Sequence, residues 1–267
     1  MSGAAGKVGS AVVSMLRADG AQVVAVDRAT TGDWGRRVDL LDYQATMGSM
    51  TGADAVVHLA AYPSPQNVTP SWLVENNVMA TFNVLEAASE LGIKRVVLAS
   101  SGSIYGYAWS PTMLEPNYLP VDEDTRLDFV DPYALTKDLG ERIGQMYARR
   151  GMSVVALRLH WVLSEEELHQ RKDTGDGEDG ARNLWGYVEL SDAARAFSLA
   201  VAADLPDRGF FPLVIAAADT MSSTPTDTLL QRWFPTVERR REFRGTCSVF
   251  DSSRARELIA WAPTFQW

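Results

Sequence analysis

Short apolar runs alternate with stretches of helical periodicity along most of the chain. The runs are rich in β-branched residues and nearly continuous, as expected for strands that are buried on both faces. They cover residues 21–26, 55–60, 95–99, 153–157 and 210–215. Helical spacing covers residues 7–19, 71–91, 132–149 and 191–203, with shorter helical patterns at 225–233 and 252–261. This alternation predicts an α/β fold: a doubly wound, Rossmann-like parallel sheet with helices on both faces.

One internal segment and the C-terminal part fall outside this alternation. Residues 164–183 are polar, acidic and glycine-rich, which is typical of either a mobile lid or a solvated surface loop. We therefore expect a core over residues 1–160 that is rejoined by about 188–217. Residues 161–187 and 218–267 would form a small C-terminal substrate lobe.

Composition narrows the possible functions. The 267 residues are 46% hydrophobic, and their net charge of -9 argues against a nucleic-acid partner, which needs a basic patch. Cys247 is the single cysteine and fits a reducing compartment. Three histidines without a cysteine cluster predict no metal site. The sequence has no apolar run of membrane-spanning length and no secretory signal, so we expect a soluble cytoplasmic protein with no membrane partner.

A glycine-rich loop at residues 3–9 opens the first predicted helix. The spacing of its glycines allows a tight turn and a close approach of the backbone to a pyrophosphate, which the helix N-terminus would stabilise. Asp27 ends the next apolar run, where a carboxylate can accept hydrogen bonds from an adenosine ribose and repels a 2′-phosphate. The core is therefore predicted to bind a dinucleotide, with NAD favoured over NADP, although Arg28 leaves that choice open.

The strand that should precede this loop is missing or truncated, because only Met1 and Ser2 stand before Gly3. Three alternatives remain: the sequence starts downstream of the true start, some residues before Met1 are not included, or the strand has been lost. A protein that lacks this central strand is expected to be less stable and to bind the dinucleotide poorly.

Tyr133 and Lys137 lie four residues apart in the helical stretch that follows Asp131 and Pro132. Asp131 is a plausible N-cap and Pro132 a plausible first helical residue. Residues four apart share a helix face, so the phenol and the ammonium should point the same way. A cation beside a phenol lowers the phenol's pKa, which suits general acid–base catalysis at neutral pH.

Three more stretches carry polar or small residues where strand ends and loops of a doubly wound sheet face a ligand crevice. They are residues 56–61, 76–88 and 98–106. In this order and at these spacings, the motifs resemble those of the extended short-chain dehydrogenase/reductase superfamily, in its NAD-dependent epimerase/dehydratase group. The resemblance covers most of the chain and includes residues 185–196.

The resemblance implies a catalytic set in which Tyr133 moves a proton, Lys137 binds the nicotinamide ribose, Ser101 orients the reacting oxygen and Asn77 supports them. The implied cofactor contacts, besides Lys137, are Gly3, Gly6, Lys7, Val8, Asp27, Asp39, Leu40, Leu59, Ala60 and Ala61. Family members often dimerise through the helices that carry Tyr133 and Asn77, so a homodimer is also implied.

Within the group, the short C-terminal part is similar to that of uronate dehydrogenases, which oxidise the anomeric carbon of a sugar acid. This likeness makes Arg182 a candidate clamp for a substrate carboxylate, or else an ordinary surface arginine. Ser64 and Ser103 are further candidates for substrate binding. Gly102 and Ser103 replace the Asn-His of those enzymes, and His160-Trp161 replaces a turn that usually contains Pro or Gly.

The sequence thus predicts an NAD-dependent oxidoreductase that acts on a hydroxyl of a sugar or sugar acid, a small-molecule substrate. One alternative is a nucleotide-sugar epimerase or dehydratase with tightly held NAD. The other is a non-catalytic dinucleotide-binding protein.

Overall fold

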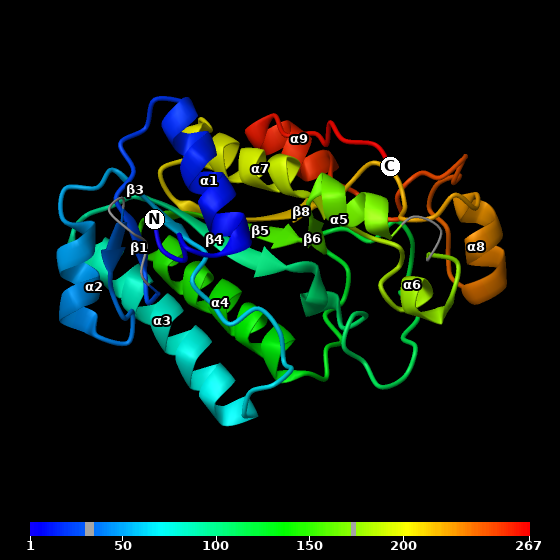
Figure 1. Cartoon of the computed structure of the whole chain (residues 1–267), viewed down its shortest axis with the longest axis horizontal. Coiled ribbons are helices and arrows are strands. Elements are labelled where there is room, and N and C mark those ends of the chain that lie inside the picture. The colour runs from blue at the N-terminus through cyan, green and yellow to red at the C-terminus, as the bar shows by residue number, and fades with distance from the viewer. Residues whose placement is uncertain (30–34, 172–174) are drawn as a thin grey trace.

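A parallel sheet between two layers of helices forms the body of the molecule (Figure 1). The computed structural model describes residues 1–29, 35–171 and 175–267. Four strands pair in the order β3 (Ala55–His58), β4 (Arg95–Ser101), β5 (Ser153–Leu159), β8 (Gly209–Ile215), all parallel. β1 (Ala25–Asp27) pairs in parallel with β2 (Gly35–Arg37). The predicted α/β fold with a parallel sheet is confirmed.

Met1 and Ser2 lie between β1 and β3, where a first strand was expected. Ser2 forms parallel bridges to Val26 and His58. Its N–H donates to Val57 O at 2.9 Å, and its carbonyl accepts from Leu59 N at 3.2 Å. Two residues therefore join the β1–β2 pair to the four-stranded sheet.

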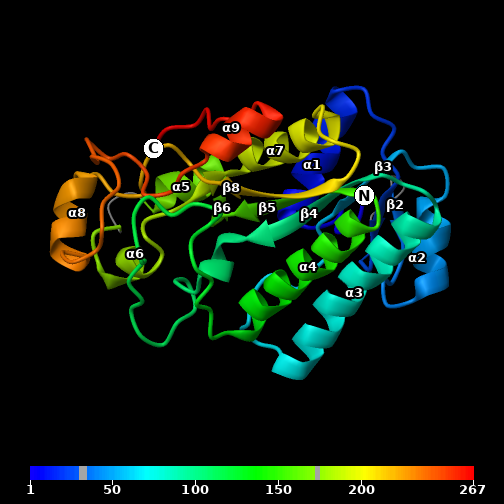
Figure 2. The same cartoon turned by 180° about the vertical axis from the view of Figure 1, so that it is seen from behind.

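Helices cover both faces of the sheet, as the periodicity predicted (Figures 1 and 2). One layer contains α1 (Lys7–Ala18), α7 (Leu190–Ala202) and α9 (Ser253–Ile259), and its core includes Val12, Phe197 and Trp261. The other contains α2 (Tyr43–Met50), α3 (Pro70–Glu90) and α4 (Pro132–Arg149), and its core includes Leu85 and Tyr147. No helix of the described residues is both long and apolar enough to cross a membrane.

Helix α4 begins where its sequence predicts. The Asp131 side chain accepts a hydrogen bond from Ala134 N at 2.8 Å, and Pro132 occupies the first turn. Asp131 thus satisfies one of the N–H groups that a helix start leaves without an intrahelical partner. This cap fixes the start of the helix that carries Tyr133 and Lys137.

A second group of elements lies beyond the ends of β4 and β5 (Figure 1). It contains α5 (Glu165–Gln170), α6 (Glu178–Arg182), α8 (Thr226–Trp233) and the short pair β6 (Val162–Leu163) and β7 (Val188–Glu189). Its core includes Leu119, Trp185, Phe234 and Phe250. The acidic segment 164–183 thus contains two short helices, with residues 172–174 outside the described part. The domain boundaries remain a prediction.

A buried ion pair connects α4 to β5. Arg158 donates from Nε and Nη2 to the two carboxylate oxygens of Glu141, at 2.9 and 2.8 Å. Both side chains are at most 6% exposed. Ser100 at the end of β4 donates to Glu141 at 2.6 Å, and Arg158 also donates to Tyr105 Oη at 3.1 Å. The Glu141 carboxylate therefore links β4, α4 and β5.

We predict that Glu141→Gln lowers the free energy of unfolding by about 3–5 kcal/mol, because it removes the carboxylate that pairs with the buried guanidinium of Arg158. Urea unfolding measures the change. The control is Arg142→Gln, which breaks the exposed pair with Asp138 on the same helix and should cost less than about 1 kcal/mol. Equal stability of the two variants would contradict this role of Glu141.

Candidate active site

A cleft of about 1380 Å³ runs along the carboxyl ends of the strands. This edge of a doubly wound sheet is where such folds bind ligands. The structure brings most of the sequence-predicted site residues together there. They are Gly3, Gly6, Lys7, Val8, Asp27, Asp39, Leu40, Leu59, Ala60, Ala61, Ser101, Ser103, Tyr133, Lys137 and Arg182. Asn77 and Ser64 are not among the residues that line this cleft.

The glycine-rich loop is wound so tightly that side chains would not fit. Gly3 has φ +74°, and a Cβ there would lie 2.6 Å from Ala60 N. A Cβ on Gly9 would lie 1.9 Å from Gly3 O. Helix α1 follows with Gly6 as its N-cap, no side chain caps its first N–H groups, and its first residues line the cleft. Such a helix start suits a pyrophosphate.

Asp27 sits at the end of β1, beside this loop. Its carboxylate accepts hydrogen bonds from Ala5 N and Ala29 N, both at 2.9 Å. These contacts fix the carboxylate at the cleft wall, where a ribose hydroxyl could donate to it. Arg28 also lines the cleft. Its Nη1 donates to Asn76 Oδ1 at 3.2 Å, and its Cζ lies over the Trp72 ring, 5.6 Å from the ring centroid.

Lys7 connects the loop to the acidic segment. Its ammonium donates to Val162 O and to Glu167 Oε2, both at 2.8 Å. The Lys7 hydrogen bond, together with Ser164 N, lowers the pKa of Glu167 to about 2. Helix α5, which carries Glu167, is therefore held against the start of α1 by an ion pair that flanks the cleft.

Tyr133 and Lys137 point to the same side of α4, as their spacing predicted. Lys137 Nζ lies 5.5 Å from the centroid of the Tyr133 ring and donates to Ala99 O at 2.7 Å. Both side chains line the cleft. A phenol and an ammonium are thus presented to a ligand from one helix face.

The pKa of the phenol is not lowered in this pocket, contrary to the expectation from the sequence. Burial, together with the charge of Asp131, raises the pKa of Tyr133 to about 12, although a hydrogen bond with Ser101 opposes the shift. Burial also lowers the pKa of Lys137 to about 8, although the nearby Glu141 carboxylate raises it. Removal of both groups from water outweighs their mutual stabilisation as an ion pair.

Ser101 is placed at the end of β4, next to the phenol. Its Oγ accepts hydrogen bonds from Ser103 N at 3.1 Å and from Ser103 Oγ at 2.8 Å. These contacts start the 3-10 turn Gly102–Tyr105 and orient the Ser101 hydroxyl. Ser101, rather than the Glu141-bound Ser100, is the hydroxyl that interacts with Tyr133.

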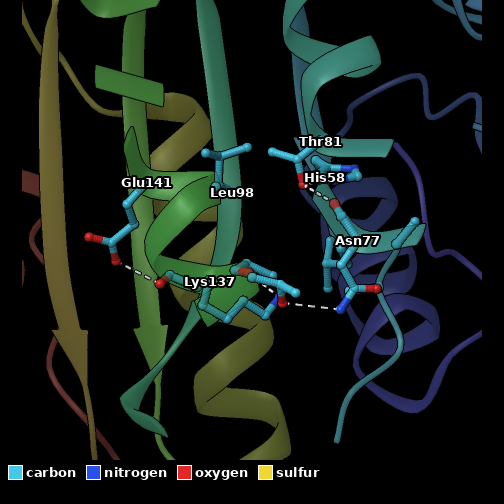
Figure 3. A pocket seen from close by; sticks show the side chains of 13 residues that line it. His58, Asn77, Thr81, Leu98, Lys137 and Glu141 are labelled. Carbon is cyan, nitrogen blue, oxygen red and sulfur yellow. Dashed lines mark hydrogen bonds between the residues drawn. The ribbon is translucent and has the colours of Figure 1, made fainter. Parts of the chain in front are cut away.

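Asn77 and Lys137 both line a separate cavity of about 20 Å³, large enough for one water (Figure 3). The Asn77 amide accepts from Tyr62 N at 2.8 Å and donates to Tyr62 O at 3.1 Å and to Thr136 at 3.2 Å. Asn77 therefore braces the loop after β3, which lines the cleft. Its catalytic role, like the substrate contact of Ser64, remains a prediction.

Arg182 lines the cleft, but its guanidinium is already engaged. Nε and Nη2 donate to Glu178 Oε1 at 3.1 and 2.6 Å, and Nη1 donates to Ser110 O at 3.0 Å. A substrate carboxylate would therefore meet an ion pair and not a single positive charge.

Two buried residues of the cleft wall were not among the sequence-predicted site residues. His160 is 5% exposed and Trp185 is fully buried, and both line the cleft. The only signal in the sequence was the unusual His160-Trp161 pair after the fifth strand. Trp185 lies in the segment 185–196 that resembles the family pattern, and no local signal in the sequence distinguishes it.

Comparisons with known proteins agree with this geometry. Residues 1–204 match the family described as "NAD dependent epimerase/dehydratase family". An L-arabinose 1-dehydrogenase (NAD(P)(+)) of Haloferax volcanii is 31% identical, covering 86% of this chain and 92% of that protein. A UDP-glucuronate 4-epimerase of Thermodesulfobacterium geofontis is 30% identical, covering 85% of this chain and 73% of that protein.

A solved structure extends the comparison to three dimensions. It is a short-chain dehydrogenase/reductase superfamily protein from Agrobacterium tumefaciens with bound NAD, 26% identical with a TM-score of 0.74. The alignment covers 99% of this chain and 92% of that one. The chain therefore belongs to the NAD-dependent epimerase/dehydratase family of the short-chain dehydrogenase/reductase superfamily.

Proposed function

We propose that this protein is an NAD-dependent dehydrogenase that oxidises a hydroxyl of a sugar or sugar acid. The observation that carries the proposal is the shared position of Tyr133, Lys137 and Ser101 in a cleft whose other end is a glycine-rich loop. The dehydrogenase relative supports oxidation at the anomeric carbon, since its name places its activity at C1.

The residues of the cleft fit a dinucleotide. The loop between Gly3 and Gly9 would hold the pyrophosphate, Asp27 would accept from the adenosine ribose, and Lys137 would bind the nicotinamide ribose. NAD supplies a nicotinamide ring that accepts a hydride. The Asp27 carboxylate favours NAD over NADP, while the neighbouring Arg28 offers a positive charge for a 2′-phosphate.

Side chains of the protein remove the proton from the sugar hydroxyl and stabilise the charge that this transfer requires. Oxidation breaks the C1–H bond with its electron pair and the O1–H bond of the sugar, and forms a lactone C=O. Tyr133 Oη takes the O1 proton, Ser101 Oγ holds O1 in line, and the ammonium of Lys137 stabilises the phenolate. The hydride leaves C1, so the products are a lactone, NADH and one proton.

A nucleotide-sugar epimerase is the second candidate, favoured by the UDP-glucuronate 4-epimerase relative. The same three residues serve both reactions, but an epimerase returns the hydride to its substrate and releases no NADH. A non-catalytic dinucleotide-binding protein is the third candidate; it would have no use for the Tyr133, Lys137 and Ser101 arrangement.

We predict that Tyr133→Phe lowers kcat for sugar oxidation at least about a hundredfold, because the general base is removed. NAD affinity should change little. NADH absorbance with a panel of aldoses and uronates measures the rate, and calorimetry measures the affinity. The control is Tyr147→Phe on the same helix, whose hydroxyl contacts Glu86 away from the cleft and whose loss should leave kcat nearly unchanged.

Each alternative gives a different result in that assay. With UDP-glucuronate added to the panel, its conversion without net NADH would show an epimerase, and NAD binding without conversion of any substrate would show a binding protein. A Tyr133→Phe variant as active as the wild type would refute the proposed chemistry itself.

We also predict that kcat/KM for oxidation rises about tenfold per pH unit up to about pH 8 and then levels off. The active form carries a Tyr133 phenolate and a Lys137 ammonium. Tyr133 has a pKa of about 12 and Lys137 a pKa of about 8, so below pH 8 the dominant form has both groups protonated. The active form has one proton fewer than this dominant form, so its population rises about tenfold per pH unit. Above pH 8 the two forms carry equal numbers of protons, so their ratio stops changing.

Lys137→Met provides the internal check on that profile. Without the ammonium, the activity should be lower at every pH and should keep rising above pH 8, because only the phenol then titrates. A wild-type profile that falls between pH 6 and 8 would contradict the assignment of Tyr133 as the base.

We further propose that the protein forms a homodimer through α3 and α4, and that it is cytoplasmic, in keeping with its single cysteine. The two helices lie side by side on one face (Figure 2). They expose Met79 and Phe82 on α3, and Leu135 and Met146 on α4, each by 37–44%. Such an apolar group on adjacent helices suits an interface between two copies.

Phe82→Glu is expected to convert the dimer to a monomer at micromolar concentration, because it places a charge in the apolar interface. Light scattering measures the mass. Val130→Glu changes an equally apolar, 65% exposed residue outside the two helices and should leave the mass unchanged. A wild-type protein that is monomeric throughout would exclude this interface.

A further inference from the structure

Residues from the start of α1 and residues from β6 and α5 line the same cleft. Lys7 and Val8 belong to the first turn of α1, which follows the glycine-rich loop. Val162 belongs to β6, and Gln170 is the last residue of α5. The segment after β5 is therefore brought to the loop that is proposed to hold the pyrophosphate of NAD.

A single ammonium connects the two parts of the chain. Lys7 Nζ donates to Val162 O at 2.8 Å and to the two carboxylate oxygens of Glu167 at 3.1 and 2.8 Å. Glu167 also accepts from Ser164 N at 2.7 Å, while Ser164 Oγ accepts from Glu167 N at 3.2 Å. This capping box fixes the Glu167 side chain on its own helix. The ion pair therefore joins the starts of two helices in a defined position.

The ammonium of Lys7 is fully engaged by these contacts. A lysine ammonium has three N–H donors, and Val162 O with the two Glu167 oxygens can occupy all of them. The family resemblance implied that Lys7 contacts the cofactor. The geometry instead leaves the pyrophosphate to the backbone N–H groups of the loop and of the first turn of α1.

The remaining contacts of α5 do not reach α1. The helix has six residues, and Leu168 is the one that is buried. Leu168 packs in a cluster with Leu163, Tyr187 and Met221, and this cluster contains no residue of α1. A helix this short is not stable by itself. The place of α5 beside the glycine-rich loop therefore depends on the pair of Lys7 and Glu167.

We infer that Glu167 is a positioning residue for the cofactor: through Lys7 it holds α5 beside the glycine-rich loop and slows the release of NAD and NADH. The inference rests on the proposed binding of NAD and adds a determinant of its release rate. The side chains of Lys7 and Glu167 are 45% and 41% exposed, and an ion pair so exposed is weak enough to open when the nucleotide exchanges.

Glu167→Gln tests the inference, because glutamine can still form the capping box but carries no charge. We expect NADH to dissociate from this variant about two- to fivefold faster than from the wild type, as for the loss of an exposed ion pair. Displacement of bound NADH by excess NAD, followed by stopped-flow fluorescence, measures the rate. The control is Glu166→Gln, whose carboxylate contacts Gln170 within α5 and whose loss should leave the rate unchanged.

Lys7→Met separates this role from direct binding of the pyrophosphate by Lys7. If Lys7 acts through Glu167, then Lys7→Met and the double variant should both release NADH as fast as Glu167→Gln, because all three lack the same pair. A direct contact predicts that Lys7→Met is faster than Glu167→Gln. It also predicts that Glu167→Gln binds NADH at least as tightly as the wild type, because a carboxylate near the phosphates is gone. Either result would overturn the inference.

Hydrogen exchange in the ligand-free protein gives a second readout, which needs neither cofactor nor turnover. The amides of α5 should exchange faster in Glu167→Gln than in Glu166→Gln, with little change in melting temperature. Faster release of NADH without faster exchange in α5 would show that Glu167 does not act through the position of this helix, and would contradict the inference.

The outcomes separate the inference from the proposed function. Release of NADH from Glu167→Gln at or below the wild-type rate would overturn the inference and leave the dehydrogenase assignment intact. A wild-type protein that binds neither NAD nor NADH would refute the proposed function and the inference with it.

Discussion

Helix α4 is held against the end of β4 by two buried polar contacts one helical turn apart. Lys137 donates to the carbonyl of Ala99, and Glu141 accepts from the hydroxyl of Ser100 while it pairs with Arg158. These contacts fix both the rotation and the height of the helix. Tyr133, one turn earlier, is therefore placed beside Ser101, and the remaining features of the cleft are arranged around that pair.

The same burial that fixes the geometry sets the acid–base properties. Desolvation raises the pKa of Tyr133 and lowers that of Lys137, so the ligand-free cleft holds a neutral phenol. Activation of the phenol then depends on a small population of the form in which Tyr133 is a phenolate and Lys137 an ammonium.

Sequence periodicity predicted the sheet and the long helices because each buries a continuous apolar face. Asp131 and Pro132 identified the start of α4, and the Tyr133–Lys137 spacing identified a shared helix face. Helices α2, α5 and α6 and strand β2 were missed, because their short sequences show no regular apolar period and few of their residues are buried.

Other features depend on contacts between segments that are distant in sequence. The ion pair between Lys7 and Glu167 and the packing of His160 against Gly102 and Phe250 have no local signature. The pKa of Tyr133 follows from its burial, which the spacing of two residues does not reveal. The family resemblance indicated the cofactor residues.

The most direct test of the account follows the hydrogen on the anomeric carbon. The enzyme would be given NAD and L-arabinose carrying deuterium at C1, and the nucleotide product would be analysed by mass spectrometry. The account predicts NADH that contains the deuterium, formed in equal amount to the lactone. Converted sugar that retains all its deuterium, with no labelled NADH, would contradict it.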